Sequence, residues 1–464
     1  MAVGFWNLDQ SPKAPAVVSE ENGVLTYGEL ASLSDRFADS LSAHGYRTLG
    51  FILCRNSLEP LAAYLGALRS GHVACLLDSD LQAELLNHLL SSYKPDWVFT
   101  PEARAIPYYV ASDSPFGFLY RPSIPPGKLP LSPQLGLLLA TSGSTGSPKL
   151  VRLSLHNLQA NASSIVSYLE MNESDRGITS LPMSYSYGLS VLNTHLLSGG
   201  QILMTNRSFL QREYWNFVLQ HRPTAIAGVP YHYEVMLQMR MLDRDLPGLQ
   251  KLTQAGGRLA PERISHTAEI CVRRGWKFFV MYGQTEATAR ISYVPPERLR
   301  DKVGSIGIAI PQGRLSLDDQ TGELLYSGPN VTLGYAENRD DLGKGDELQG
   351  QLRTGDLARC DEDGFYYIVG RLKRFLKIFG KRFSLDEIEG LLTKHGSGPA
   401  ACFGSDDHVK IAIQNAADEK VVTEVLETVL KVHPSAYSVV KIDSIPRFAS
   451  GKLDYQSLAK WGGA

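Results

Sequence analysis

A loop rich in glycine, serine and threonine follows a run of aliphatic residues in the stretch LLLATSGSTGSPKLVRLS, residues 137–154. A strand that ends in such residues presents backbone N–H groups and hydroxyls to one small region, and these donors suit phosphate oxygens. Two glycines in the loop permit positive φ and close approach of a ligand. We therefore expect a phosphate site here, with the candidate residues Thr141, Ser142, Gly143, Ser144, Thr145, Gly146 and Lys149.

The spacing of this loop differs from that of a Walker A loop, which requires G-x-x-x-x-G-K-[ST]. Gly146 is followed by Ser, Pro and then Lys149. Pro148 also disfavours helical geometry at the residue before it, so the loop does not run straight into a helix. A flexible Ser/Gly linker is the plain alternative. The aliphatic run before the loop and LVRLS after it bury both ends, which favours the phosphate site.

TSGSTGSPK resembles the phosphate-binding motif of the adenylate-forming superfamily, which comprises acyl- and aryl-CoA synthetases, adenylation domains and firefly-type luciferases. Further motifs of that superfamily follow in the expected order. MYGQTEAT, residues 281–288, implies Tyr282 packing on adenine, Thr285 contacting the α-phosphate and Glu286 holding Mg²⁺. Mg²⁺ prefers carboxylate, phosphate and water oxygens, which suits that glutamate. QAGGRLAP resembles the glycine pair that lines the adenine and acyl pockets, here Gly256 and Gly257.

Two later stretches, GELLYSGPNVTLGY and LRTGDLARCDEDGFYYIVGRLKRFLKI, resemble the next motifs of the superfamily. The resemblance implies that Asp356 accepts hydrogen bonds from the ribose hydroxyls, a role that suits an acceptor-only carboxylate. It places Arg371 on ribose or phosphate. PRFASGKLDY near the C-terminus resembles the motif that supplies the catalytic lysine, here Lys452.

In this superfamily the small C-terminal domain rotates between two poses, one for adenylate formation and one for thiol attack. Lys373 in GRLKR aligns with the hinge, and Lys377 and Gly380 in LKIFGK align with the motif that lines the thiol tunnel. A glycine there lets a narrow pantetheine arm pass close to the backbone.

The stretch LPMSYSYGLSV resembles the substrate-side motif of acyl-CoA ligases, with Tyr185 at its histidine position and Tyr187 and Gly188 following. These residues and Tyr231 are our candidates for the acyl pocket, although aromatic residues are as often plain packing residues. The motif has no Asp to pair with a substrate ammonium, which disfavours an α-amino acid. A long fatty chain, a short or hydroxylated acid and an aryl acid all stay open.

The resemblance implies a ligase that converts a carboxylic acid and ATP into an acyl-adenylate and pyrophosphate, then transfers the acyl group to the thiol of CoA. The expected cofactors are ATP, Mg²⁺ and CoA. One alternative is a stand-alone adenylation enzyme that loads the phosphopantetheine of an acyl carrier protein. Another is a degenerate protein that only binds nucleotide or acyl groups, but Glu286, Asp356 and Lys452 are all present.

The elements that must position these residues follow an α/β rhythm. TYGELASLSDRFADSLSAHGY predicts an amphipathic helix with Thr26 as its N-cap, and TLGFILC a buried strand. PLAAYLGALRSG and HNLQANASSIVSYL predict further helices, HVACLLD, QILMT and TAIAGV further strands, and residues 112–133, with six prolines, an exposed connection. We expect an α/β fold: a large N-terminal domain (residues 1–370) of parallel-rich sheets with a β-rich subdomain, a hinge (371–376) and a small mobile α+β C-terminal domain (377–464).

Composition restricts the class of protein. The chain has 464 residues with 46 Lys plus Arg against 48 Asp plus Glu, so no strong overall field favours nucleic acid or an anionic membrane. Five dispersed cysteines without a CxxC pair argue against a disulfide framework and a zinc site. No segment predicts a signal peptide or a membrane span, so we expect a cytoplasmic protein with no nucleic-acid partner.

Overall fold

The computed structural model describes residues 4–42, 45–128, 130–140, 149–372, 374–379, 381–447, 453–455 and 457–458. The chain divides into two compact units. The first comprises Met1–Arg314 and Ser327–Leu352, and the second Leu315–Tyr326 and Arg353–Ala464. The β-rich residues from 353 onward therefore group with the C-terminal part. The domain boundaries and the hinge expected from the sequence stay predictions.

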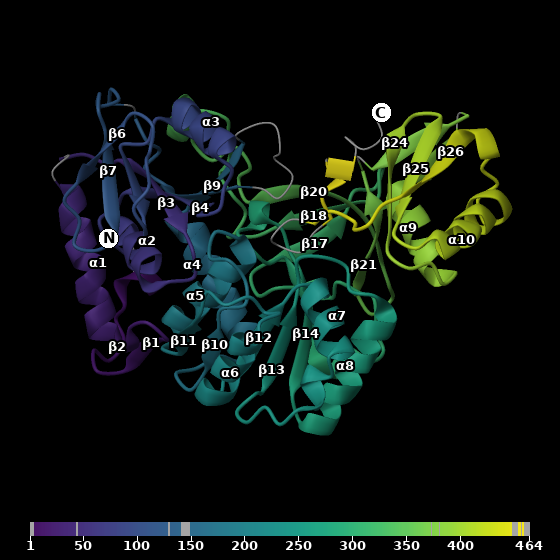
Figure 1. Cartoon of the computed structure of the whole chain (residues 1–464), viewed down its shortest axis with the longest axis horizontal. Helices are drawn as coiled ribbons and strands as arrows, with labels where there is room; N and C mark the ends of the chain where they lie inside the picture. Colours follow the sequence, from purple (N-terminus) through teal and green to yellow (C-terminus); the bar gives the residue numbers. More distant parts are fainter. Residues whose placement is uncertain are drawn as a thin grey trace. The chain divides into compact units, whose positions relative to one another are not determined.

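A mostly parallel sheet of the first unit runs across the lower part of Figure 1. Among the described residues it has nine strands, in the order β16 (Ile308–Ala309), β15 (Ser292–Val294), β14 (Lys277–Tyr282), β13 (Lys251–Gln254), β12 (Ala225–Gly228), β10 (Arg176–Ile178), β11 (Gln201–Met204), β1 (Pro15–Ser19) and β2 (Gly23–Thr26). The neighbours from β14 through β1 pair in parallel, and the strands at both edges pair antiparallel. Parallel sheets need helical crossovers, which the alternation of helix and strand patterns predicts.

A second, mixed sheet lies in the same unit. Its eight described strands have the order β19 (Gly334–Ala336), β9 (Leu150–Ser154), β8 (Leu135–Ala140), β4 (Val73–Asp78), β3 (Leu49–Cys54), β5 (Trp97–Thr100), β7 (Phe118–Pro122) and β6 (Tyr109–Ser112). The strands β8 and β9 are antiparallel neighbours, with Ala140 opposite Leu150. The glycine-rich loop therefore joins the two strands of a hairpin, as the failed Walker spacing and Pro148 suggest. Strand β7 also corrects our expectation of an exposed connection at residues 112–133, because part of that segment pairs with β5 and β6.

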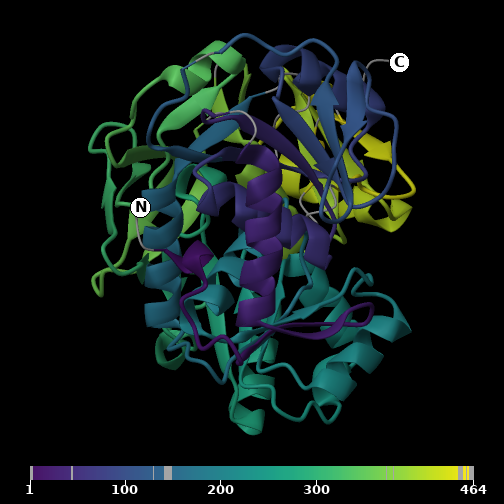
Figure 2. The same cartoon turned by 90° about the vertical axis from the view of Figure 1, so that its left-hand side faces the viewer.

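Helices cover the sheets of this unit. They are α1 (Tyr27–Leu41), α2 (Leu58–Arg69), α3 (Ala83–Tyr93), α4 (Leu155–Tyr168), α5 (Ser186–Ser198), α6 (Arg212–His221), α7 (Pro230–Gln238) and α8 (Pro261–Arg274). Helix α4 packs against β8 and β9 of one sheet, and its neighbour α5 packs against β10 and β11 of the other. The pair α4–α5 thus forms a layer between the two sheets. Helix α1 is nearest the viewer in Figure 2, with β1 and β2 below it.

Local sequence signals explain where the helices begin. Thr26 caps α1 by accepting a hydrogen bond from the Glu29 amide, and the Glu29 carboxylate accepts one from the Thr26 amide. Ser154 and Asn157 make the same reciprocal pair at the start of α4. The predicted N-cap and the helices and strands quoted above are confirmed, with bounds that differ by a few residues.

In its described residues the second unit consists of small sheets with helices packed against them. A four-stranded sheet has the order β17 (Arg314–Leu317), β18 (Glu323–Ser327), β20 (Gln351–Cys360) and β21 (Tyr366–Arg371). A hairpin of β22 (Phe375–Ile378) and β23 (Lys381–Ser384) leads into α9 (Leu385–Lys394). A three-stranded sheet of β24 (Ala400–Ser405), β25 (His408–Ile413) and β26 (Tyr437–Lys441) completes it, with α10 (Glu419–Thr423). The helix α10 continues into one π-helical stretch, Glu424–Val429.

All five cysteines are free thiols, and four of them are buried. Within the described part of the chain, no helix is long and apolar enough to cross a membrane. The same residues contain no cluster of three or more His, Cys, Asp or Glu side chains suited to a metal ion.

Candidate active site

Four neighbouring parallel strands of the nine-stranded sheet end at the same edge. These strands, β10, β12, β13 and β14, lie next to one another in matched register. The segments that leave their carboxyl ends are residues 179–185, 229–231, 255–257 and 283–286. Ligands bind outside the carboxyl ends of strands in open α/β sheets. The topology therefore brings the predicted acyl motif, glycine pair and YGQTE motif to one edge.

The tyrosines of the acyl motif lie where α5 begins. Tyr185 is its N-cap residue, and Tyr187 is 2% exposed. The Tyr187 hydroxyl lies 2.8 Å from both the carbonyl oxygen and the side-chain oxygen of Thr253, so it is tied to β13. A Cβ at Gly188 would lie 2.1 Å from the carbonyl oxygen of Pro182. Glycine is thus required for the chain to turn this tightly into α5.

The glycine pair forms a close-packed wall opposite Tyr185. Gly256 has a φ of +83°, and a Cβ there would lie 2.6 Å from the Tyr185 hydroxyl oxygen and 3.1 Å from Cγ1 of Val229. The carbonyl of Gly257 accepts a hydrogen bond of 2.9 Å from Nε2 of Gln254, the last residue of β13. Burial raises the pKa of Tyr185 to about 12, so its hydroxyl keeps its proton near neutral pH.

Lys149 of the glycine-rich motif and Glu286 of the YGQTE motif both contact Tyr335. The Glu286 carboxylate accepts a hydrogen bond of 3.0 Å from the Tyr335 hydroxyl. The Lys149 ammonium lies 3.7 Å from the centre of the Tyr335 ring, a cation–π contact. Sequence reasoning missed Tyr335, although it ends the quoted stretch GELLYSGPNVTLGY. Its position next to the phosphate-loop lysine is visible only in the folded chain.

Arg152 on strand β9 holds the strand that carries Tyr335, β19, in place. The Arg152 side chain is fully buried and donates hydrogen bonds to the carbonyls of Leu333 and Tyr335, at 2.9 and 3.0 Å. It also makes an ion pair with Glu347. Burial, followed by the negative charge of Glu286, raises the pKa of Tyr335. The tyrosine therefore stays a hydrogen-bond donor to the carboxylate at neutral pH.

The remaining residues of the YGQTE motif are half-buried at the end of β14. The Thr285 hydroxyl lies 3.3 Å from that of Ser186 on α5. The Tyr282 hydroxyl accepts a hydrogen bond of 3.1 Å from Nε2 of Gln284. A single glutamate with neighbouring hydroxyls fits Mg²⁺, because that ion takes one or two carboxylates and fills its other positions with phosphate and water oxygens.

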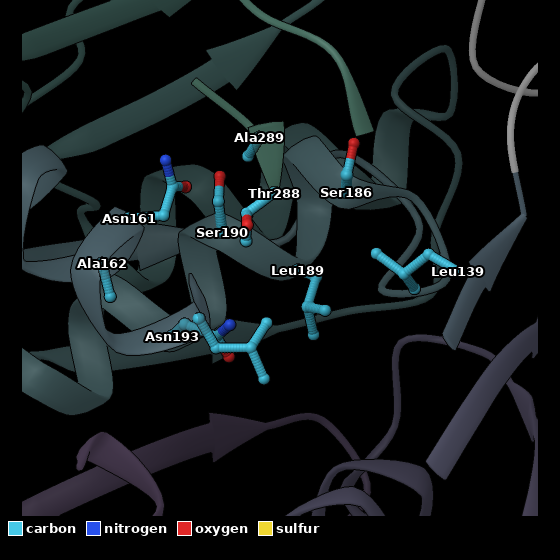
Figure 3. Close-up of a pocket in the computed structure, with 10 residues that line it drawn as sticks. Leu139, Asn161, Ala162, Ser186, Leu189, Ser190, Asn193, Thr288 and Ala289 are labelled. Atoms are coloured by element: carbon cyan, nitrogen blue, oxygen red, sulfur yellow. The ribbon is translucent and has the colours of Figure 1, made fainter. Parts of the chain in front are cut away.

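A small cavity lies between α4, α5 and the segment after Glu286 (Figure 3). Its internal volume is about 10 Å³, room for roughly one water molecule. Ser186 and Ser190 project from α5 toward the segment that carries Thr288 and Ala289. The other lining residues are Leu139, Leu158, Asn161, Ala162, Leu189 and Asn193. Tyr231, our further pocket candidate, is 36% exposed on α7 and is not among the residues that line this cavity.

The second unit contains the predicted ribose-binding pair. Asp356 on β20 and Arg371 on β21 are directly opposite in the antiparallel register. The Arg371 Nε lies 3.0 Å from an Asp356 carboxylate oxygen, and the aspartate is 4% exposed. Lys377 on β22 has an exposed side chain, and its amide donates a 2.8 Å hydrogen bond to Asp406. Their roles in binding stay predictions.

Several predicted residues lie outside the described part of the chain. They are Thr141, Ser142, Gly143, Ser144, Thr145, Gly146, Lys373, Gly380 and Lys452. The two strands that flank the glycine-rich loop, β8 and β9, lie in the interior of the eight-stranded sheet.

Comparison with known proteins agrees with this architecture. A profile of the AMP-binding enzyme family matches residues 5–336, well over half of the chain. The chain belongs to the AMP-binding enzyme family. An indoleacetate–CoA ligase from Aromatoleum aromaticum is 30% identical over 92% of this chain and 91% of its own length. A feruloyl-CoA synthase from Amycolatopsis is 28% identical over 97% of both chains.

Solved structures of AMP-binding enzymes have the same fold. The o-succinylbenzoate CoA synthetase of Bacillus subtilis, in complex with its acyl-adenylate intermediate, superposes with a TM-score of 0.78 over 98% of both chains at 22% identity. The predicted superfamily and fold class are confirmed. The family match includes the glycine-rich loop, the acyl motif, the glycine pair and the YGQTE motif, and it ends at Ala336, just after Tyr335.

Proposed function

We propose that this chain is an AMP-forming acid–CoA ligase, which activates a small carboxylic acid with ATP and transfers the acyl group to CoA. The observation that carries the proposal is the meeting of Lys149 and Glu286 across Tyr335, at the carboxyl edge of the parallel sheet. A cation from the phosphate loop and a carboxylate suited to Mg²⁺ are the groups that a bound nucleotide triphosphate needs. The family and its CoA-ligase relatives support the same activity.

The first step is attack of a carboxylate oxygen on the α-phosphorus of ATP. The bond from that phosphorus to the oxygen bridging the β-phosphate breaks, and pyrophosphate leaves. Negative charge gathers on the phosphate oxygens in the transition state, so donors placed there lower the barrier more than they stabilise bound ATP. We assign this role to Thr285, Lys149 and Lys452. Glu286 would hold Mg²⁺, which would supply further neutralisation of the phosphates.

The second step consumes the mixed anhydride. The CoA sulfur attacks the acyl carbon, the bond from that carbon to the AMP oxygen breaks, and AMP leaves while the thiol proton passes to solvent. Lys377 and Gly380 would line the path of the pantetheine arm, and a hinge at Lys373 would bring them into place. We also propose a cytoplasmic location; the free thiols support it, because disulfides are rare in that reducing compartment.

Acid-dependent exchange of radiolabelled pyrophosphate into ATP tests the first step, across a panel of fatty, hydroxy, aryl and dicarboxylic acids. We expect exchange with at least one acid, and a CoA thioester of that acid when CoA is added. The Lys452→Ala variant should lose exchange but still convert pre-formed acyl-adenylate and CoA into thioester. Exchange with no acid would refute the proposed ligase. A product that forms on a holo carrier protein and never on CoA would refute the assigned acceptor.

A further inference from the structure

Thr288, two residues after Glu286, has a backbone conformation that L-residues rarely adopt. Its φ is +65° and its ψ is −51°, and the Ala289 amide donates a hydrogen bond of 2.7 Å to the Ala287 carbonyl across it. These features define a γ-turn with positive φ, the rare and strained form of that turn. A β-branched residue with positive φ is an outlier. Such strain persists only where the surrounding structure holds it, and it clusters at functional sites.

The strained turn closes the loop that carries the YGQTE motif. A Cβ at Gly283 would lie 1.9 Å from the Ala289 carbonyl oxygen, so the segment after the turn packs directly on the backbone of the motif. The Thr288 amide also donates a hydrogen bond of 2.9 Å to the Thr285 carbonyl. The backbone of the motif is thus a tight loop, in which the positions of Thr285 and Glu286 depend on the angles at Thr288.

Asn330, on the segment before β19, holds this turn. The residue is 1% exposed. Its Nδ2 donates two hydrogen bonds of 2.8 Å, to the carbonyls of Ala287 and Arg290. Its own carbonyl accepts a hydrogen bond of 2.7 Å from the Thr288 hydroxyl. One asparagine therefore binds the turn at its first residue, at its central residue and one residue past its end.

The same segment also contacts the predicted Mg²⁺ ligand. The Thr332 amide donates a hydrogen bond of 3.0 Å to the Glu286 carbonyl, and the Tyr335 hydroxyl donates one of 3.0 Å to its carboxylate. Both the backbone and the side chain of Glu286 are therefore held by this segment, while Asn330 fixes the turn that follows. A carboxylate that binds Mg²⁺ needs a set position, because that ion demands near-ideal octahedral geometry.

We infer that Asn330 is a positioning residue for the adenylation step, which acts through the strained turn at Thr288 to set the places of Thr285 and Glu286. The inference rests on the proposed ligase function. The hydrogen bonds of Asn330 offset the strain at Thr288, so the loop is ordered before MgATP arrives. Groups that are already in place lose less free energy on binding and stabilise the transition state better. The attack of CoA on the acyl-adenylate involves no triphosphate and should depend on Asn330 far less.

The test is the Asn330→Ala variant of the full chain, which removes both side-chain hydrogen bonds and keeps the backbone carbonyl. Calorimetry without acid or CoA should show the Kd for MgATP rising about 10-fold or more, the effect of two neutral hydrogen bonds. The Kd for ATP in EDTA should change much less, because Glu286 then has no cation to hold. Pyrophosphate exchange should fall by a similar factor, while thioester formation from pre-formed acyl-adenylate and CoA should stay nearly unchanged.

The matched control is Asn157→Ala. Asn157 is also buried, and its Nδ2 donates hydrogen bonds of 2.7 and 2.8 Å to the carbonyls of Pro329 and Val331, on either side of Asn330. The control removes bonds of the same kind from the same segment without a contact to the turn. Urea unfolding should therefore show a loss of stability in both variants, but the Kd for MgATP should rise only in Asn330→Ala. Equal rises in both would indicate a merely structural role and refute the inference.

A second variant, Thr288→Gly, tests the strain itself. Glycine adopts positive φ without a side-chain penalty, so Asn330→Ala should raise the Kd for MgATP clearly less in this background than in the wild type. An undiminished effect would refute the role of the turn. Asn330→Ser, which keeps one donor, replaces Asn330→Ala if that variant does not fold. MgATP that binds Asn330→Ala as tightly as the wild type refutes only this inference, whereas exchange with no acid refutes the proposed function.

Discussion

A single methyl group at Gly256 should disturb both stability and the acyl site. The residue has a φ of +83°, which costs an L-residue about 1–2 kcal/mol. Alanine recovers about 0.4–1 kcal/mol of this by restricting the unfolded chain. The new Cβ would also lie 2.6 Å from the Tyr185 hydroxyl oxygen, and such overpacking costs about 1–3 kcal/mol. Gly256→Ala should therefore lower the free energy of unfolding by about 2–4 kcal/mol.

A matched glycine separates these two costs. Gly275 ends α8 with a φ of +71°, and a Cβ there would have no atom within 4 Å. Gly275→Ala should thus lower the free energy of unfolding by only about 1 kcal/mol, the net cost of the backbone angle. The difference between the two variants measures the contact with Tyr185 and Val229.

A double-mutant cycle with Tyr185→Phe then locates the contact. Removing the hydroxyl leaves Cζ, at 3.7 Å, as the nearest ring atom to the new methyl group. Gly256→Ala should cost about 1–2 kcal/mol less in the Tyr185→Phe background than in the wild type. The assay is urea unfolding of the four proteins, followed by fluorescence at one temperature, with acid-dependent pyrophosphate exchange as the readout of the site. Effects that add to within about 0.5 kcal/mol would refute the close approach of Tyr185 to Gly256.

Three further predictions concern other contacts of the first unit. Tyr335→Phe removes the hydrogen bond to Glu286, worth about 1.5–3 kcal/mol for a charged acceptor, and should raise the Mg²⁺ concentration needed for exchange about 10-fold or more. Lys251→Met leaves Asp175, which is 2% exposed, without its partner at 2.9 Å, and should lower the free energy of unfolding by about 3–5 kcal/mol in urea. Burial lowers the pKa of His232 from 6.5 to about 4. Between pH 6.5 and 4 the unfolded chain binds a proton at His232 that the folded chain does not. The contribution of neutral, buried His232 to the free energy of unfolding is therefore complete above pH 6.5 and is lost as the pH falls toward 4. His232→Phe should remove that dependence, of up to roughly 3 kcal/mol.

The tyrosine and lysine variants each have a control in the same chain. Tyr109→Phe removes a hydrogen bond to the Pro95 carbonyl and should leave the Mg²⁺ requirement unchanged. Lys277→Met breaks the pair with Glu170, whose side chains are 47% and 71% exposed, and should change the stability by less than about 1 kcal/mol. Equal Mg²⁺ shifts in both tyrosine variants, or equal losses in both lysine variants, would contradict the reasoning. So would parallel pH profiles of the wild type and His232→Phe.

Sequence patterns predicted the elements but not the contacts between distant ones. Thr26 and Ser154 precede their helices by one residue, so capping chemistry is readable locally. The likeness of TSGSTGSPK and MYGQTEAT to family motifs was enough to name the superfamily. Tyr335 reaches Glu286 only because its strand β19 pairs with β9. Arg152 on β9 donates a hydrogen bond to the Tyr335 carbonyl from 183 residues earlier in the chain. No periodicity encodes such a contact.

Arg290 illustrates the same limit for a buried side chain. Nothing in the sequence around Arg290, which follows MYGQTEAT, distinguishes it from other arginines, and most arginines are exposed. Only packing between α5 and the segment after β14 shows that it is buried against Tyr187. Tyr231 shows the opposite case, a predicted pocket residue that proves to be exposed. The sequence YHY gives no reason to separate its two tyrosines, but in the fold Tyr231 is exposed and Tyr233 is fully buried.

The buried Arg152 also constrains how this family can diverge. It joins strand β9, which leaves the glycine-rich loop, to the strand of Tyr335, and it satisfies its charge through Glu347. Loss of Glu347 alone leaves the buried guanidinium without its carboxylate, whereas a change of both residues to neutral ones of similar volume is tolerable. Positions 152 and 347 should therefore co-vary among AMP-binding enzymes, and a lineage that replaces one should carry a compensating replacement of the other.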